Sequence, residues 1–237
     1  MDAGGTAGGL GALAAVGRET VQDRVYAQLR ESLIHGTFDA GETFPAAEVA
    51  QRLGVSSMPV REALARLVSE RALETTPGRR VRVPGLSRAR ARDLRRARLL
   101  IEGDLARRAL PNLTAADLDG LERLTRDYEA ATDLRALARL NHGFHFGLYA
   151  RAGSTVLLPM VESLWMQAGP YVRAAQRLHS PLTDPSATLH HRGILQAART
   201  GDEGAMLREL EADVARTFAI LERTGDGVWD DSEGAAA

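Results

Sequence analysis

The stretch that decides the fold is Leu53-Gly54-Val55-Ser56-Ser57-Met58-Pro59-Val60-Arg61-Glu62-Ala63-Leu64. A short amphipathic segment, residues 46–53, leads into it and ends at a glycine, and a second helical segment runs over residues 57–70. Ser57 is predicted to cap the second helix. Pro59 falls in the first turn, where a missing N–H costs nothing. The sequence therefore predicts two short helices joined by a tight turn.

The flanking segments complete a recognisable unit. Apolar residues recur every four positions over residues 20–35, which predicts an amphipathic helix ahead of the pair. After the pair, residues 72–76 and 80–83 predict two strands, and the second alternates polar and apolar side chains. An arginine-rich turn, Pro77-Gly78-Arg79, joins them. This order is the pattern of a winged helix-turn-helix over residues 19–85.

The chemistry of this unit suits DNA. A helix fits the major groove, where its N-terminal residues reach base edges. Serine hydroxyls and helix N–H groups can donate to phosphate, and an arginine one turn along can reach phosphate or guanine. The residues predicted to contact DNA in the groove and at the wing are Ser56, Ser57, Met58, Arg61, Arg79 and Arg80. Topology alone also allows a winged module that binds protein.

The charge distribution predicts contact with phosphate at one end only. The net charge of the 237-residue chain is −1, and all 30 basic residues are arginine. Arginines dominate residues 78–98, whereas the chain is acid-leaning from Glu102 onward. A solvated charged helix face is the alternative for residues 88–96.

The chain has no cysteine, which excludes disulfides and thiolate metal sites.

The composition also indicates where the protein is located and which terminal segments are disordered. No apolar run approaches the roughly 20 residues of a membrane span, and the first residues lack the basic region of a signal peptide. We therefore expect a cytoplasmic protein without membrane contact. The small residues 1–18 and the acidic residues 225–237 predict a disordered arm and a disordered tail.

The rest of the chain reads as helical. Alanine, leucine and arginine dominate it, and all three are strong helix formers. Predicted helices span residues 87–109, a segment opening at Thr114, and residues 132–152, 155–178, 186–200 and 203–223. Residues 86–224 are therefore predicted to form an antiparallel bundle of six to seven helices, and the fold class is mainly α.

The stretch quoted at the outset resembles the signature of GntR-type bacterial regulators, whose recognition helix carries a Ser-x-x-Pro-Val-Arg-Glu-Ala-Leu run. The bundle resembles the all-helical, FCD-type ligand-binding domain of the FadR-like branch. The segments that carry this second resemblance are Arg98-Leu-Leu-Ile-Glu102, Asn141-His-Gly-Phe-His145 and His191-Arg-Gly-Ile-Leu195. Two positions depart from the family pattern, because Ala47 and Ser57 stand where arginine is usual. The resemblance then implies fewer phosphate contacts and a smaller salt dependence.

The resemblance also implies a divalent metal site. Relatives bind a metal through an Asp, a His on the same helix and two further His residues. The matching positions here are Asn141, His145, His191 and Asp213. Two imidazoles, a carboxylate and an amide oxygen suit Zn²⁺, Ni²⁺ or Mn²⁺. The alternative is a hydrogen-bonded polar cluster around an organic ligand, without metal.

Relatives use an arginine like Arg98 to hold a carboxylate effector, which a guanidinium suits. A plain Arg98–Glu102 ion pair one helical turn apart is the alternative. The residues predicted to bind effector are Arg98, Glu102, Trp165 and Tyr171. The function expected is a ligand-responsive regulator, a repressor that binds palindromic operator DNA as a homodimer and is released or re-oriented by a small carboxylate. The rival interpretation is a metal-dependent all-helical enzyme, against which no general base or nucleophile motif is found.

Overall fold

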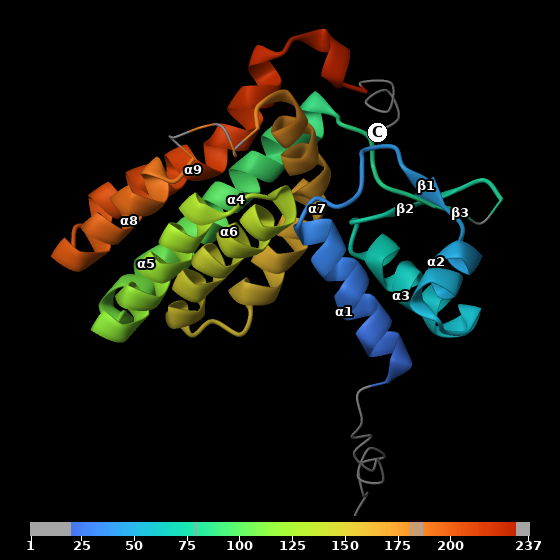
Figure 1. The fold of residues 1–237 in the computed structure, drawn as a ribbon, viewed down its shortest axis with the longest axis horizontal. Helices are drawn as coiled ribbons and strands as arrows, with labels where there is room; N and C mark the ends of the chain where they lie inside the picture. The colour runs from blue at the N-terminus through green and yellow to red at the C-terminus, as the bar shows by residue number, and fades with distance from the viewer. Residues whose placement is uncertain (1–19, 79, 181, 183, 185–186, 231–237) are drawn as a thin grey trace, which may run out of the picture.

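The computed structural model describes residues 20–78, 80–180, 182, 184 and 187–230. These residues form a small N-terminal head, blue to cyan in Figure 1, and a larger helical bundle, green to red. The predicted arm at residues 1–18 and the last seven residues lie outside the described part. Within the described part, none of the helices is both long enough and apolar enough to cross a bilayer.

The head is a winged helix-turn-helix, as predicted. Its elements are α1 (Val21–Ile34), β1 (Thr43–Phe44), α2 (Ala46–Leu53), α3 (Ser57–Ser69), β2 (Glu74–Thr76) and β3 (Arg80–Arg82). α1 starts with a capping box, in which Thr20 and Asp23 each bond the other's backbone N–H. The three strands pair antiparallel in the order β1-β3-β2.

Three details of the head differ from the sequence prediction. The cap of α3 is Ser56, one residue earlier than expected. The strand expected from residue 72 begins only at Glu74, because the N–H groups of Ala72 and Leu73 donate to the Leu67 carbonyl oxygen and close the end of α3. β1 was not predicted, since two residues are too short to show an alternating pattern.

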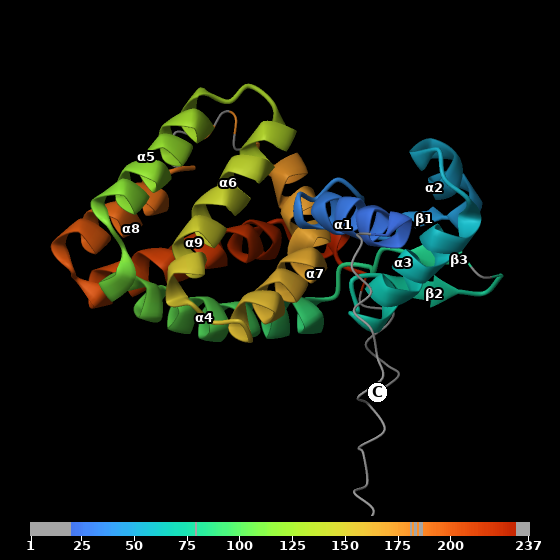
Figure 2. The same cartoon turned by 90° about the horizontal axis from the view of Figure 1, so that it is seen from below.

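The bundle contains six α-helices within the described residues, which agrees with the predicted mainly α fold. They are α4 (Arg88–Ala109), α5 (Ala115–Ala130), α6 (Leu134–Tyr149), α7 (Leu157–Leu178), α8 (Leu189–Thr200) and α9 (Glu203–Arg223). Short 3-10 turns, η1 (Leu110–Asn112) and η2 (Ala150–Ala152), end α4 and α6. Figure 2 shows α4 running along one side of the bundle, with α9 and α7 beside it.

The start of the C-terminal tail differs from the prediction. Disorder was expected from residue 225, but Asp226–Val228 forms a short 3-10 helix, η4. Beyond it, the backbone N–H of Asp230 donates to the Leu86 carbonyl oxygen at 2.8 Å. This contact holds the chain against the linker before α4, which the acidic composition of the segment did not indicate.

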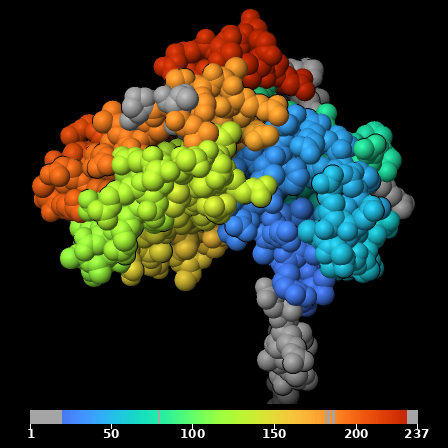
Figure 3. All heavy atoms as spheres, viewed as in Figure 1, coloured from blue at the N-terminus to red at the C-terminus, as the bar shows by residue number. Residues whose placement is uncertain are grey.

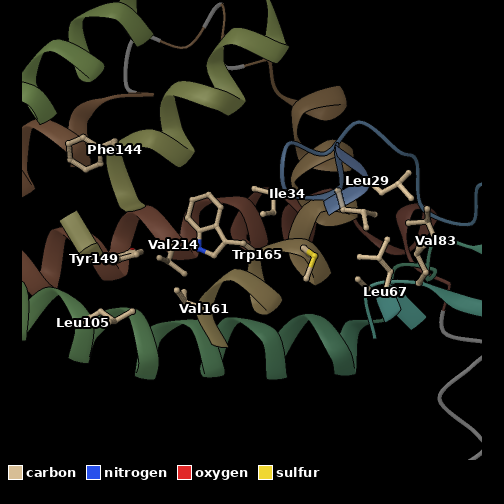
Figure 4. Close-up of a cluster of buried hydrophobic side chains, with 14 of the residues drawn as sticks. Leu29, Ile34, Leu67, Val83, Leu105, Phe144, Tyr149, Val161, Trp165 and Val214 are labelled. Carbon is tan, nitrogen blue, oxygen red and sulfur yellow. The ribbon is translucent and has the colours of Figure 1, made fainter. Parts of the chain in front are cut away.

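Head and bundle share one hydrophobic core, because α1 packs closely on α7. Two glycines permit the approach. A Cβ on Gly169 of α7 would overlap the carbonyl oxygen of Leu33, and a Cβ on Gly36 would lie 3.0 Å from the Gly169 oxygen. Figure 3 shows the atoms of the head in continuous contact with the bundle, and Figure 4 shows Ile34 of α1 next to Trp165 of α7. Three ion pairs flank the contact: Arg30–Glu162, Arg173–Asp39 and Arg177–Asp39.

Substitution Gly169→Ala should therefore weaken the attachment of the head. The added methyl group must displace backbone rather than a flexible side chain, so we expect a loss of about 1–3 kcal/mol in the free energy of unfolding. Chemical denaturation measures it. The control is Gly103→Ala in α4, where the nearest atom, Leu207 Cδ2, lies 3.9 Å away. This control should be neutral or stabilising by up to about 1 kcal/mol. Equal stability of the two variants would contradict a tight contact.

Candidate functional site

Three side chains from three helices of the bundle meet at one point. His145 lies on α6, His191 on α8 and Asp213 on α9, and one ligand atom of each lies within 4.8 Å of the other two. His145 Nε2 is 3.0 Å from Asp213 Oδ2, and His191 Nε2 is 3.9 Å from Asp213 Oδ1. The fold thus brings together three of the four side chains predicted as metal ligands.

The histidine nitrogens in this triad, His145–His191–Asp213, fit a metal ion. Among the described residues, neither ring nitrogen of His191 has a hydrogen-bond partner, and His145 Nε2 has none with hydrogen-bond geometry. Buried polar atoms without a partner are rare and costly. Two ligand atoms about 2.1 Å from one ion lie about 3.0–3.4 Å apart at octahedral to tetrahedral angles. The 3.0 Å spacing of His145 and Asp213 therefore suits a shared ion.

The electrostatics of the triad favour the protonation states that bind metal. Burial lowers the pKa of His191 to about 4, although Asp213 opposes the shift, so the ring is neutral at neutral pH. Burial acts to raise the pKa of Asp213, but the contacts with His145 and His191 outweigh it and hold that pKa well below its ordinary value. The site then offers a neutral imidazole and an ionised carboxylate.

A buried chain of hydrogen bonds orients His145. Glu102 on α4 is 0% exposed and accepts from three side chains: Arg98 Nε at 2.6 Å, Trp165 Nε1 at 3.1 Å and the Tyr149 hydroxyl at 2.5 Å. Because the Tyr149 proton goes to Glu102, the Tyr149 oxygen accepts from His145 Nδ1 at 3.0 Å. Nδ1 then carries a proton, and Nε2 is the ring nitrogen directed at the other two members of the triad.

A cavity of about 90 Å³ lies beside the triad. Its polar and aromatic lining includes Asn141, Trp165, Asp213 and Arg216. A smaller cavity of about 60 Å³ shares three of these side chains and is also lined by Arg98. Asn141, the fourth predicted ligand, is thereby placed at the same cavity as Asp213. Ile34, which belongs to α1 of the head, lines both cavities.

The predicted effector residues do not all reach this cavity. Arg98 and Trp165 line the smaller one. Glu102 is occupied by its three donors, so the ion pair with Arg98 that the sequence left as an alternative is present. Tyr171 lies instead in a separate hydrophobic cluster, where it packs against Phe218 and its hydroxyl donates to a backbone carbonyl oxygen at 3.3 Å.

Sequence reasoning missed three residues at the site. Tyr149 lies four positions after His145 and Arg216 lies three positions after Asp213, so helical spacing could have found both. Ile34 gave no signal, because its place at the cavity depends on how the head docks onto the bundle. A contact between segments so far apart in sequence is not encoded in local periodicity.

The start of α3 is open to solvent. Ser56 caps the helix without a side-chain hydrogen bond, so the first-turn N–H groups are left without that partner. Met58 is 66% exposed, and Arg61 one turn on is exposed. On the wing, Arg80 is exposed and Arg82 pairs with Glu74 at 2.6 Å. The remaining predicted contacts are Ser57, which is half-buried, and Arg79, which lies outside the described residues.

Comparisons with known proteins agree with both halves of the fold. Residues 14–83 match the family described as bacterial regulatory proteins, gntR family, and residues 93–216 match the FCD domain. The chain is 28% identical over 196 residues to the HTH-type transcriptional regulator McbR of Escherichia coli (strain K12), covering 81% of this chain and 89% of that protein. The HTH-type transcriptional repressor RspR of the same strain is 28% identical over 149 residues, which is 62% of this chain and 65% of the relative.

Solved structures give the same result. The structure of E. coli McbR/YncC superposes with a TM-score of 0.82 at 27% identity, covering 87% of this chain and 99% of that one. A putative transcriptional regulator GntR from Rhodococcus sp. RHA1 shares the fold at 20% identity, with a TM-score of 0.69 over 85% of this chain and 97% of that one.

The stability of the chelator-treated protein should fall as the pH drops below 6.5. The unfolded chain takes up a proton at His191 with an ordinary pKa, whereas the folded ring resists protonation until about pH 4. The free energy of unfolding should therefore drop by about 2 kcal/mol between pH 7 and pH 5 from this residue. Urea denaturation at both pH values measures the drop. His191→Gln should reduce it and His190→Gln should not. An unchanged drop in His191→Gln would contradict the assignment.

Proposed function

Because the chain belongs to the GntR family of bacterial regulators and carries an FCD domain, we propose that it is a ligand-responsive repressor that binds palindromic operator DNA as a homodimer. The observation that carries the proposal is the open start of α3, where exposed Met58 and Arg61 flank a helix N-terminus. The relatives are named as transcription regulators, so the rival enzyme interpretation is not favoured.

The proposed reading of DNA follows from the head. The start of α3 enters the major groove, where Ser56, Ser57 and Arg61 contact phosphate and base edges. Arg80 and Arg79 on the wing contact phosphate or the minor groove. Two heads are needed to read both halves of a palindrome, which is why the proposal includes a homodimer. Among the relatives, RspR is named a repressor, and a glc operon regulator of E. coli is named an activator.

The bundle would receive the signal. His145, His191 and Asp213 would hold a divalent ion, with the Asn141 amide oxygen as a fourth ligand. A bound Zn²⁺, Ni²⁺ or Mn²⁺ would supply a Lewis-acidic point of attachment for a carboxylate oxygen. The adjoining cavity of about 90 Å³ is far below the roughly 300–1,000 Å³ of pockets for drug-sized ligands. An effector that fits this cavity is therefore small, and the ion would favour one with a carboxylate.

Coupling between effector and DNA would be direct. Ile34 belongs to the helix that carries the head, and it lines the same cavity as Asp213 and Trp165. A ligand that fits better with one placement of α1 than with another shifts the head between those placements. By linkage, DNA must change the affinity for the effector by the same factor that the effector changes the affinity for DNA.

A gel shift tests the DNA proposal. The probe is the DNA upstream of the protein's own gene, compared with random DNA of equal length. Arg61→Ala should weaken binding by at least about tenfold and reduce the salt dependence by about one phosphate contact per head. The control is Arg199→Ala, which removes an ion pair with Glu122 in the bundle and should leave binding unchanged. If wild type and Arg61→Ala bind the probe equally, and no better than random DNA, the regulator proposal fails.

Metal analysis tests the triad. After dialysis against zinc and then against metal-free buffer, the wild type should retain the ion, and His145→Ala should bind it at least about tenfold more weakly. The matched control is His190→Ala, because His190 neighbours His191 in sequence but pairs with Glu209 at 2.8 Å. Retention by His190→Ala together with loss in His145→Ala supports the site. Equal metal content in all three proteins would refute it.

A further inference from the structure

The cavity next to the triad is lined by the side chain of Arg216. Arg216 lies on α9 one turn beyond Asp213, lines the cavity of about 90 Å³, and its side chain is 24% exposed. Its positive charge acts on His191 and on the Tyr128 hydroxyl, which places it within electrostatic reach of both. Arg216 therefore meets the two requirements of an anion-binding residue, proximity to the site and access from solvent.

The Arg216 guanidinium is already paired with a carboxylate of the same chain. Asp184, in the connection between α7 and α8, forms an ion pair with Arg216, and its side chain is only 12% exposed. Asp184 Oδ2 also lies 3.0 Å from His179 Nε2. The group that Arg216 holds in this structure is thus a partly buried carboxylate, which contacts two residues of the cavity lining, Arg216 and His179. A small organic acid presents the same chemical group.

Arg98, unlike Arg216, has a fully buried carboxylate as its partner. Its side chain is 6% exposed, its Nε donates to Glu102 at 2.6 Å, and its guanidinium lies 4.6 Å from the Trp165 ring centroid. Glu102 also accepts from Tyr149 and from Trp165. An effector carboxylate could take over the Nε and Nη2 donors of Arg98 only by leaving a fully buried Glu102 without its counter-ion, which costs several kcal/mol. Arg216 is more exposed than Arg98, and Asp184 would keep His179 as a partner if Arg216 bound another carboxylate.

We propose that Arg216 binds the carboxylate of the effector, and that Asp184 occupies this subsite in the effector-free protein. The inference rests on the proposed function, because it assumes that the effector is an acid that enters this cavity. It assigns the specificity for a carboxylate to α9 rather than to Arg98 on α4. Asp184 acts as an internal competitor, so it sets the effector concentration at which the subsite fills.

The proposal makes a prediction that a purely structural ion pair does not. Asp184→Asn and Arg216→Gln both remove the same ion pair, so a structural role changes any ligand affinity in the same direction. If the subsite belongs to Arg216, the two variants act in opposite directions. Asp184→Asn removes the competitor and tightens binding, whereas Arg216→Gln removes the binding group and weakens it.

The experiment is a titration of the full chain with acetate in chloride-free buffer, followed by Trp165 fluorescence in a Trp229→Phe background. Acetamide, the neutral analogue, measures binding that does not depend on charge. We expect acetate to bind about tenfold more tightly to Asp184→Asn and about tenfold more weakly to Arg216→Gln. The control Arg192→Gln breaks the exposed pair with Glu129 and should match the wild type. Circular dichroism verifies the fold of each variant.

Two other outcomes overturn the proposal and are distinguishable. If acetate binds the wild type but both variants shift affinity in the same direction, or neither does, the subsite is not Arg216 and the proposed carboxylate effector stands. If the wild type does not distinguish acetate from acetamide, the carboxylate effector of the proposed function fails and the subsite fails with it. The gel shift with operator DNA is independent of both results.

Discussion

The buried carboxylate of Glu102 is the interaction on which the site depends. A fully buried charge is tolerated only when it is paired and hydrogen-bonded, and Glu102 has Arg98, Trp165 and Tyr149 as donors. Because the single hydroxyl proton of Tyr149 is donated to Glu102, the Tyr149 oxygen must accept a hydrogen bond from His145 Nδ1. That order places a proton on His145 Nδ1 and fixes the direction of the ring. The position of His145 Nε2, on α6, is thus set by a carboxylate on α4.

The second constraint is the close approach of α1 to α7, which turns a cavity of the bundle into a cavity shared with the head. The approach needs a position without a side chain at Gly169, since any Cβ would meet the Leu33 carbonyl oxygen. Once the backbones are this close, Ile34 reaches the wall that Trp165 and Asp213 also line. Trp165 therefore belongs to both constraints, because its ring lines the cavity and its indole N–H donates to Glu102.

The sequence predicts a feature of the fold or the site only when the residues that form it lie close together along the chain. The recognition helix was predictable because turn, cap and apolar spacing all lie within one short stretch. His145, His191 and Asp213 were predictable only through resemblance, because they come from three helices and no spacing links them. The Arg98–Glu102 pair was predicted as an alternative from its helical spacing, whereas Arg216, a second guanidinium close to the triad, was overlooked. Tyr171 was misplaced, because an aromatic residue on a long helix can face either of two hydrophobic clusters.

Burying the histidine nitrogens of the triad without partners lowers the stability of the bundle, and this loss bears on the function of the site. Each buried polar atom without a partner costs about 1–3 kcal/mol. Within the part of the chain that the structure describes, both ring nitrogens of His191 are in that condition, beside a stacked Phe144. An apolar side chain of similar shape at this position would not carry this cost. An ion that binds the triad recovers part of the cost, so binding there stabilises the bundle as well as filling a site. Asp213 is a member of the triad and also lines the cavity shared with Ile34, so the triad adjoins the place where the head is attached.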